Sequence, residues 1–197
     1  MRVFLYSELQ RQIEKSGVER AILHQRKALE ANGVCCAERW QDADVVHINT
    51  VFPHSFFLAK KAKRHGIPVV YHAHSTKEDF RNSYVGSNLF APLFQRWIKL
   101  CYQQGTKIVT PSFYARSLLK QYGIEKKIHV ISNGIALSEY QKDTAAGQRF
   151  RKQYAGSGDS FCGNADSQKR DSGLCAAGEG NAAVSVYLVW LYQFAFR

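Results

Sequence analysis

Residues 107–132, KIVTPSFYARSLLKQYGIEKKIHVIS, contain the pattern that decides the fold. Two short runs rich in β-branched residues, Lys107–Thr110 and 128–132, flank a stretch that opens at Ser112 and keeps helical periodicity to Gln121. A helix between two buried strands implies a right-handed crossover that joins parallel strands. This segment therefore predicts one unit of a parallel α/β sheet.

The same alternation of strand and helix extends toward the N-terminus. Asn32-Gly33 and His65-Gly66 are typical of residues that end helices. The strands that we expect there are Arg2–Tyr6, 44–49 and 68–72, and the helices are Gly17–Ala31, 55–64 and 89–102. On the C-terminal side we expect helical pieces at about 138–154. Residues 1–154 are thus predicted to form one α/β domain, a Rossmann-like parallel sheet with helices on both faces.

The composition changes abruptly after Tyr154. Residues 155–197 are rich in Gly and carry no helix or strand period before Val184. One permitted choice of codons for this tail, read one nucleotide later, encodes a strand, a Pro/Gly turn, an amphipathic helix and a second strand in that order. We therefore expect 155–197 to be an irregular, out-of-frame tail in place of the beginning of a second domain. A natural Gly- and Ser-rich tail is the alternative.

The charge of the chain limits its partners. The chain has a formal net charge of +11, and the positive excess lies in residues 1–154, because the tail carries a net charge of −1. Such an excess suits a nucleic acid, an anionic bilayer or a phosphorylated substrate. No recognition-helix, RNP or zinc pattern accompanies the charge, so we do not expect nucleic acid to be the partner.

Cysteines and apolar runs indicate the compartment. The five cysteines are odd in number and lack metal-ligand spacing, which favours reduced thiols over a disulfide framework. Polar Ser7-Glu8 follows the first apolar strand at once, unlike a signal peptide. The longest apolar run, 182–196, falls short of the ~20 residues of a membrane span. We expect a cytoplasmic protein.

The main candidate for chemistry follows the strand at 68–72, at the edge of the sheet where ligands bind in such folds. The expected substrate-binding residues there are His72, His74, Ser75, Thr76 and Arg81. An imidazole can bind a sugar hydroxyl, stabilise a leaving phosphate or relay a proton. The two histidines lack a convincing third ligand for zinc, so neither a metal nor a cofactor is expected. An ordinary loop with one satisfied core histidine is the alternative.

Two further turns lie where ligands approach a parallel sheet. Gly17 and Arg20 belong to a turn before the first helix, where glycine loops meet phosphates, although Glu19 would repel a phosphate. Asn133-Gly134 follows the strand at 128–132 and tolerates the positive φ of a tight turn. Each signal is weak alone.

Two helices combine cationic and aromatic residues. Basic amphipathic helices can lie on anionic lipid, each cation contributing about 1 kcal/mol. Packing of the apolar face on the sheet is the alternative for both. The expected membrane-facing residues are Lys60, Lys61, Lys63, Arg64, Arg96, Trp97 and Lys99.

Several strings together carry a resemblance to a known family. They are LYSEL, SGVERA, HQRKALEANGV, DVVHINT, VVYHAHSTKEDFRNSYVGSN, KIVTPSFYARSLLKQYGI and HVISNGI. The chain from Met1 to about Tyr154 resembles the N-terminal, acceptor half of a GT-B retaining, nucleotide-sugar-dependent glycosyltransferase of the family 4 type. It is most similar to bacterial enzymes that add a hexose to diacylglycerol glycolipids.

The resemblance implies a set of roles. His74 resembles the histidine that contacts the transferred sugar, which makes it the expected catalytic residue. Gly17 matches the loop near the donor phosphates, and Asn133-Gly134 match the interdomain turn. The donor-side Arg/Lys pair and the C-terminal glutamate motif of the family have no counterpart here. A chain without them is expected to be inactive until the donor domain is restored.

Two functions therefore remain open. The first is a truncated glycosyltransferase on the inner face of the cell membrane, which transfers a hexose from a nucleotide sugar to diacylglycerol or a glycosyl-diacylglycerol. The nucleotide sugar is a co-substrate of the complete enzyme rather than a cofactor. The second is a non-catalytic domain that binds a lipid surface or another polyanion.

Overall fold

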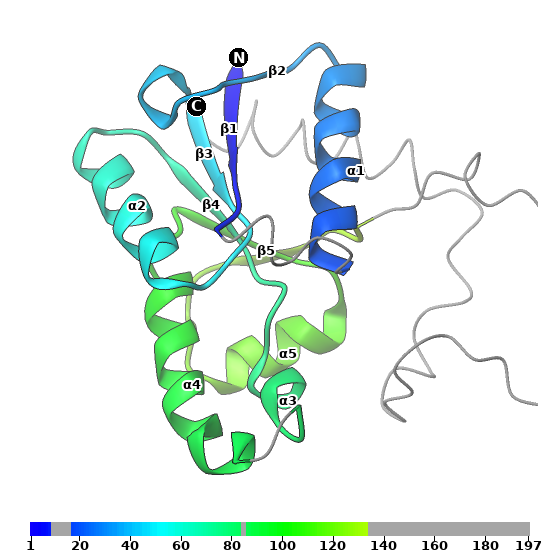
Figure 1. Ribbon diagram of the computed structural model, residues 1–197, viewed down its shortest axis with the longest axis vertical. Helices are drawn as coiled ribbons and strands as arrows, with labels where there is room; N and C mark the ends of the chain where they lie inside the picture. The colour runs from blue at the N-terminus through cyan, green and yellow to red at the C-terminus, as the bar shows by residue number, and fades with distance from the viewer. Residues whose placement is uncertain (9–16, 84–85, 134–197) are drawn as a thin grey trace, which may run out of the picture.

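The computed structural model describes residues 1–8, 17–83 and 86–133 (Figure 1). The expectations for Gly134, for the helical pieces at 138–154 and for the tail at 155–197 lie outside these residues. Within them, the predicted α/β fold is confirmed: helices cover both faces of a parallel sheet.

The sheet has six strands in the order β2-β1-β3-β4-β5-β6, and every neighbouring pair is parallel. The strands are β1 (Arg2–Tyr6), β2 (Cys35–Cys36), β3 (Val45–Ile48), β4 (Val69–His72), β5 (Lys107–Thr110) and β6 (Ile128–Val130). The chain moves from β1 outward to β2, then returns to the other side of β1 and continues to β6. This reversal separates the helices into two groups, because right-handed crossovers in opposite directions cover opposite faces.

The helices are α1 (Gly17–Ala31), α2 (Pro53–Arg64), α3 (Lys77–Phe80), α4 (Ser87–Tyr102) and α5 (Phe113–Gln121), with a 3₁₀ turn at Trp40–Asp42. Figure 1 shows α1 on one side of the sheet and α2, α4 and α5 on the other.

Strand alternation sorts the core into two clusters. On the α1 face, Leu29 packs with residues such as Val45 and Val70. On the opposite face, Val46 and Tyr71 belong to a larger cluster with residues of α2, α4 and α5. Because successive residues of β3 and β4 change face, a residue's position in the strand identifies the cluster it joins.

The helix ends follow the predicted signals. Gly33 and Gly66 adopt φ of 70° and 74° after α1 and α2, a conformation that residues with a Cβ rarely adopt. The Ser112 side chain accepts a hydrogen bond from Ala115 N and so caps α5. These local signals explain why the predicted helix ends agree with the structure.

Three short elements were not predicted: β2, the 3₁₀ turn and α3. With two to four residues each, they are too short to show a periodicity. α3 nevertheless had a local signal, a capping box in which Thr76 and Asp79 bond to each other's backbone.

Candidate substrate site at the carboxyl edge of the sheet

The strand order reverses its direction at β1 and β3, whose carboxyl ends lie at the same edge of the sheet. The chain leaves these two adjacent strands toward opposite faces, and ligands of open α/β sheets bind at such a switch point. Ser7 and Glu8 follow β1, whereas Asn49 and Thr50 follow β3. His74 lies beyond β4, the next strand along the sheet.

Three imidazole rings gather on the α1 face of this edge. The rings of His47 and His72 are stacked with centroids 5.4 Å apart, and those of His72 and His74 with centroids 4.0 Å apart. β4 ends at His72, but Ala73 N still donates to Val109 O at 2.7 Å. The extended backbone therefore runs far enough to place both predicted histidines on one side, as strand alternation requires.

An amide pair joins these rings to α1. Gln25 Nε2 donates to Asn49 Oδ1 at 3.1 Å and to His72 Nδ1 at 3.0 Å. Asn49 Oδ1 also accepts a hydrogen bond from His74 Nε2 at 3.1 Å. Gln25 and Asn49 are buried, whereas His74 is partly exposed. The network thus connects the interior of the α1 face to a residue that is only partly buried.

Burial keeps the three rings uncharged at neutral pH. It lowers the pKa of His47 to about 3, with a smaller effect of His74, and the pKa of His74 to about 4. Burial, followed by the neighbouring His74 and His47, also lowers the pKa of His72 well below its usual value. Neutral imidazoles exchange hydrogen bonds with hydroxyl groups but do not neutralise a phosphate.

The network is incompletely paired. Within the described ranges, Gln25 Oε1, Asn49 Nδ2 and His72 Nε2 are buried without a hydrogen-bond partner, and so are Ser7 Oγ and Asn133 Oδ1 nearer the ends of β1 and β6. An unpaired buried polar atom costs stability and is rare in folded proteins. Three of these atoms belong to one hydrogen-bonded network, and incomplete pairing of this kind is commonly found at functional sites.

Tyrosines of the opposite face hold the loop that follows His74. Tyr102 OH donates to Ser75 O at 2.7 Å and accepts from Ser75 N at 3.3 Å. Tyr122 OH accepts from Lys77 N at 3.0 Å and donates to Glu78. The backbone on the C-terminal side of His74 is therefore attached to α4 and α5.

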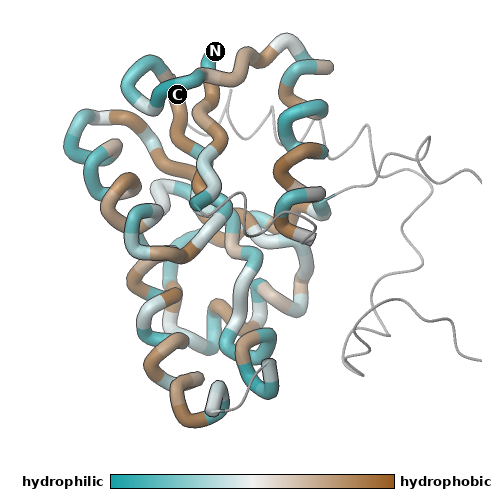
Figure 2. Tube along the Cα trace, in the orientation of Figure 1, coloured by the Kyte–Doolittle hydropathy of each residue, from teal (hydrophilic) through white to brown (hydrophobic). Residues whose placement is uncertain are grey.

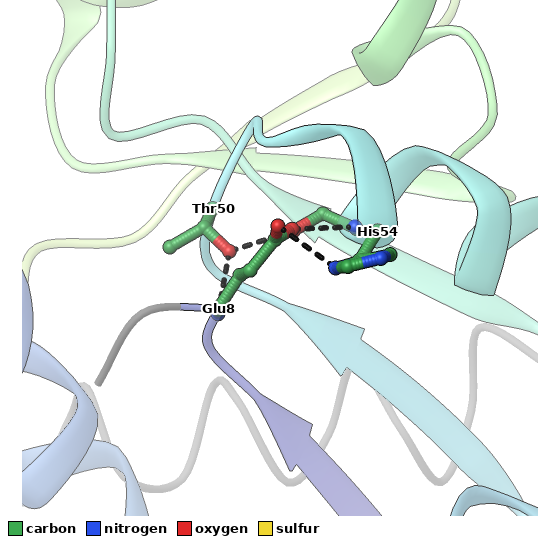
Figure 3. Close-up of polar contacts among 4 residues, drawn as sticks. Glu8, Thr50 and His54 are labelled. Carbon is green, nitrogen blue, oxygen red and sulfur yellow. Dashed lines mark hydrogen bonds and ion pairs between the residues drawn. The ribbon is translucent and has the colours of Figure 1, made fainter. Parts of the chain in front are cut away.

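Glu8, which follows β1, caps the N-terminus of α2 with its side chain. Its carboxylate accepts hydrogen bonds from Ser55 N at 2.9 Å and Ser55 Oγ at 3.2 Å, and its backbone N donates to Thr50 Oγ1 (Figure 3). His54 Nδ1 lies 3.2 Å from the same carboxylate. A negative charge at a helix N-terminus is favourable, so Glu8 fastens the end of β1 to α2.

The other predicted substrate residues have varied positions. Ser75 lies beside His74 with its backbone held by Tyr102, and the Thr76 hydroxyl is occupied within the capping box of α3. Arg81 is exposed at the end of α3, and Asn133 follows β6 at the same edge. The expected turn before the first helix was wrong for Gly17 and Arg20, because Gly17 begins α1 and Arg20 lies within it.

The predicted membrane-facing residues divide into two groups. Lys63, Arg64 and Arg96 are exposed, while the exposed Lys60 and Lys61 lie over the rings of Phe56 and Trp40. Trp97 and Lys99 are partly buried instead. Trp97 packs on Phe56 and donates from Nε1 to Val51 O at 2.6 Å, so it helps to join α4 to α2.

The exposed surface of α4 is unexpectedly apolar. Leu89, Leu93, Arg96 and Leu100 are exposed at helical spacing, with Leu89 79% and Leu93 63% accessible. The N-terminal turns of α4 are brown in Figure 2, at the end of the molecule where α3 also lies. Among the described helices, none is long and apolar enough to cross a membrane.

Some site residues were not predicted. His47 and Asn49 stand two residues apart in the strand at 44–49, and this period of two was a visible signal for a shared face. Gln25 gave no such signal, because its contact partners lie 24 and 47 residues away. No group of three or more His, Cys, Asp or Glu side chains in ranges 1–8, 17–83 and 86–133 is arranged to hold a metal.

Comparison with known proteins supplies the family. The profile of Glycosyltransferase Family 4 matches residues 34–139. The chain is also similar to the processive diacylglycerol alpha-glucosyltransferase of Acholeplasma laidlawii, with 36% identity over 156 residues. The match covers 78% of this chain and 46% of that enzyme, so the chain spans less than half the length of the relative. The chain belongs to Glycosyltransferase Family 4 and corresponds to the N-terminal half of a GT-B glycosyltransferase.

Proposed function

We propose that the chain is the acceptor-binding half of a glycosyltransferase that transfers a hexose from a nucleotide sugar to a membrane glycolipid acceptor. Diacylglycerol and glycosyl-diacylglycerol are the acceptors that we have in mind, with retention of the anomeric configuration. The observation that carries this proposal is the 36% identity to a diacylglycerol glucosyltransferase across 78% of the chain.

The chemistry of the carboxyl edge supports a sugar ligand. Neutral imidazole and amide groups are suited to hydroxyl groups, and His74 is the partly exposed member of the set. We assign His74 to the transferred sugar. With a lowered pKa, His74 does not supply positive charge to the leaving diphosphate, so that charge stabilisation falls to a donor-binding domain.

The surface of α4 supports contact with a bilayer. Its exposed leucines offer apolar area, and Arg96 on α4 and Lys60, Lys63 and Arg64 on α2 are exposed on the helices of the same face of the sheet. Together with the net charge of +11, this composition favours an anionic membrane surface over a neutral one. We propose peripheral binding to the inner face of the cell membrane, which would bring the carboxyl edge of the sheet to a lipid acceptor.

A non-catalytic lipid-binding domain would share this surface but not the transfer reaction. We also propose that residues 155–197 are read out of frame, so that one restored nucleotide near codon 155 would encode the donor-binding domain. The catalytic test therefore needs two chains: the 197-residue chain and its frame-restored form.

The experiment measures transfer of radiolabelled glucose from nucleoside-diphosphate glucose to diacylglycerol in anionic vesicles. We expect transfer by the frame-restored chain and none above background by the 197-residue chain. His74→Ala should lower transfer roughly tenfold or more, as the loss of one ligand hydrogen bond in a closed site would, and leave vesicle binding unchanged. His65→Ala, which changes an exposed ring, is the control.

Two results would contradict these proposals separately. Transfer by the 197-residue chain itself would disprove the frame proposal and the need for a donor domain. A frame-restored chain that folds and binds vesicles but transfers no sugar would disprove the enzyme and favour the lipid-binding domain.

A further inference from the structure

The buried amides beneath His74 determine which ring nitrogen carries its proton. A carbonyl oxygen of an amide only accepts hydrogen bonds, so the contact between Asn49 Oδ1 and His74 Nε2 at 3.1 Å requires a proton on Nε2. A neutral imidazole has one N–H, which leaves Nδ1 of His74 with the lone pair.

Gln25 fixes the orientation of the Asn49 amide. Its Nε2 has two hydrogens and two acceptors, Asn49 Oδ1 at 3.1 Å and His72 Nδ1 at 3.0 Å. If the Asn49 amide alone turned over, its NH₂ group would face the NH₂ group of Gln25. If the Gln25 amide alone turned over, two carbonyl oxygens would face each other. Neither amide can therefore change without the other.

The same reasoning extends to the other two rings. Because His72 Nδ1 accepts from Gln25, neutral His72 carries its proton on Nε2. His47 Nε2 lies 3.3 Å from that same Nδ1 and can share it only as a second donor. Three tautomers and two amide orientations are consequently coupled, and the opposite arrangement requires all of them to reverse together.

We propose that Asn49 and Gln25 are positioning residues that hold His74 as its Nε2–H tautomer, so that Nδ1 accepts a hydrogen bond from a hydroxyl of the transferred sugar. The assignment of the ligand rests on the proposed glycosyltransferase function, whereas the tautomer rests on the network and on the orientations that the Gln25 and Asn49 amides have in the structure. His74 suits this role because its ring is partly exposed while both amides are buried. The lowered pKa of His74 keeps the acceptor nitrogen unprotonated at neutral pH.

The first test measures the tautomer in the 197-residue chain by long-range ¹H–¹⁵N NMR of the histidine rings, with His74→Gln to assign the signals. We expect Nε2 of His74 to be protonated and Nδ1 to be unprotonated at neutral pH. A protonated Nδ1, or a mixture of both tautomers, would overturn the proposal.

Variants separate positioning from folding. Asn49→Asp keeps an acceptor for His74 and Gln25, so the Nε2–H tautomer should persist while the added negative charge raises the pKa of His74. Asn49→Leu and Gln25→Leu should instead give tautomer mixtures at His74. Gln104→Leu, in which the lost side chain bonds only to Leu100 O in the last turn of α4, is the matched control and should change nothing. An unchanged tautomer in a folded Asn49→Leu chain would contradict the role of Asn49.

The second test adds methyl α-glucoside as the probe. A hydroxyl that donates to Nδ1 should shift the ¹⁵N signal of this nitrogen and leave that of Nε2 nearly in place, and the shift should be weaker in Asn49→Leu. A shift at Nε2 alone, or none at high glucoside concentration, would overturn the sugar hydroxyl as the ligand. Because the tautomer is read without sugar or turnover, loss of the proposed transfer reaction would leave the first result standing.

Discussion

The two faces of the sheet use polar groups differently at the same edge. On the α1 face, the side chains of His47, Asn49 and His72 share hydrogen-bond partners, and within the described ranges Asn49 Nδ2 and His72 Nε2 are buried without one. On the other face, tyrosine hydroxyls have complete partners, such as Thr50 O for Tyr71 at 2.8 Å. Burial lowers the pKa of the histidines and raises the pKa of Tyr71 and Tyr102. Within the described ranges, the α1 face thus has buried polar atoms without partners, whereas the tyrosine hydroxyls of the other face bond to the backbone of loops.

The largest expected effect that tests this contrast is a loss of unfolding free energy at acid pH, caused by the buried histidines of the α1 face. The pKa values of His47 and His74 are about 3 and about 4 in the folded chain, below the usual value near 6.5. The unfolded chain therefore binds more protons below about pH 6.5. The free energy of unfolding therefore keeps its full value above that pH. It decreases as the pH falls toward 4, by up to about 1.4 kcal/mol per pH unit for each such histidine.

Urea denaturation at several pH values measures this dependence. His47→Leu should reduce the slope, since one buried titrating ring is removed, while His65→Leu removes an exposed ring and should not. Equal slopes for all three chains would mean that these histidines are not buried in their neutral form.

The second effect tests the tyrosine face. Tyr102→Phe should lower the free energy of unfolding by about 1–3 kcal/mol, because the backbone N–H and C=O of Ser75 lose their partner. Tyr114→Phe removes a hydroxyl from a half-exposed ring and is the control. Thermal or urea unfolding gives the difference, and a loss no greater than that of the control would show that the hydroxyl does not hold the loop.

Glu8→Gln should have a smaller effect, about 1 kcal/mol, since Glu8 takes the place of a capping side chain at α2. The charge that favours the helix N-terminus disappears, although the amide oxygen can still accept from Ser55 N. Glu30→Gln, which changes an exposed side chain of α1, is the matched control. Equal unfolding free energies in urea for the two variants would show that Glu8 does not stabilise α2 as a cap.

The smallest change in stability is expected on the outer surface of α4. Leu93→Ser should alter the unfolding free energy by no more than about 0.5 kcal/mol, because the side chain is 63% exposed. The fraction of the variant that sediments with anionic vesicles should nevertheless be lower than that of the unaltered chain. It should also fall more steeply as salt is raised. Leu23→Ser, on α1 at the other face, should bind as the unaltered chain does. Equal binding of both variants would exclude this surface of α4 from lipid contact.

Long elements of the fold were predictable from sequence, and short ones were not. The period of α1 and the Gly33 stop are local, so the helix is found where it was expected. β2 consists of Cys35–Cys36 only, and pairing with β1 rather than any local pattern makes it a strand. Tertiary contact decides elements of that length.

The site was partly predictable for the same reason. His72 and His74 could be identified because they lie at the end of a buried strand, but their shared side depended on whether the extended backbone continued to His74, which the sequence did not decide. The Gln25 amide depends on how α1 crosses the sheet, which no spacing in the sequence reports. Likewise, the role of Trp97 in joining α4 to α2 follows from packing, although its place beside Arg96 and Lys99 suggested lipid.

The position of β1 inside the sheet has a consequence for biosynthesis. Arg2 pairs with Cys35 and Val3 with Val45, so β1 stays without a strand partner until β2 and β3 have left the ribosome. A parallel sheet needs such long connections, and its assembly is slow compared with that of local hairpins. During this interval the apolar segment Val3-Phe4-Leu5 has no strand partner, and unpaired apolar segments of this kind are prone to aggregate.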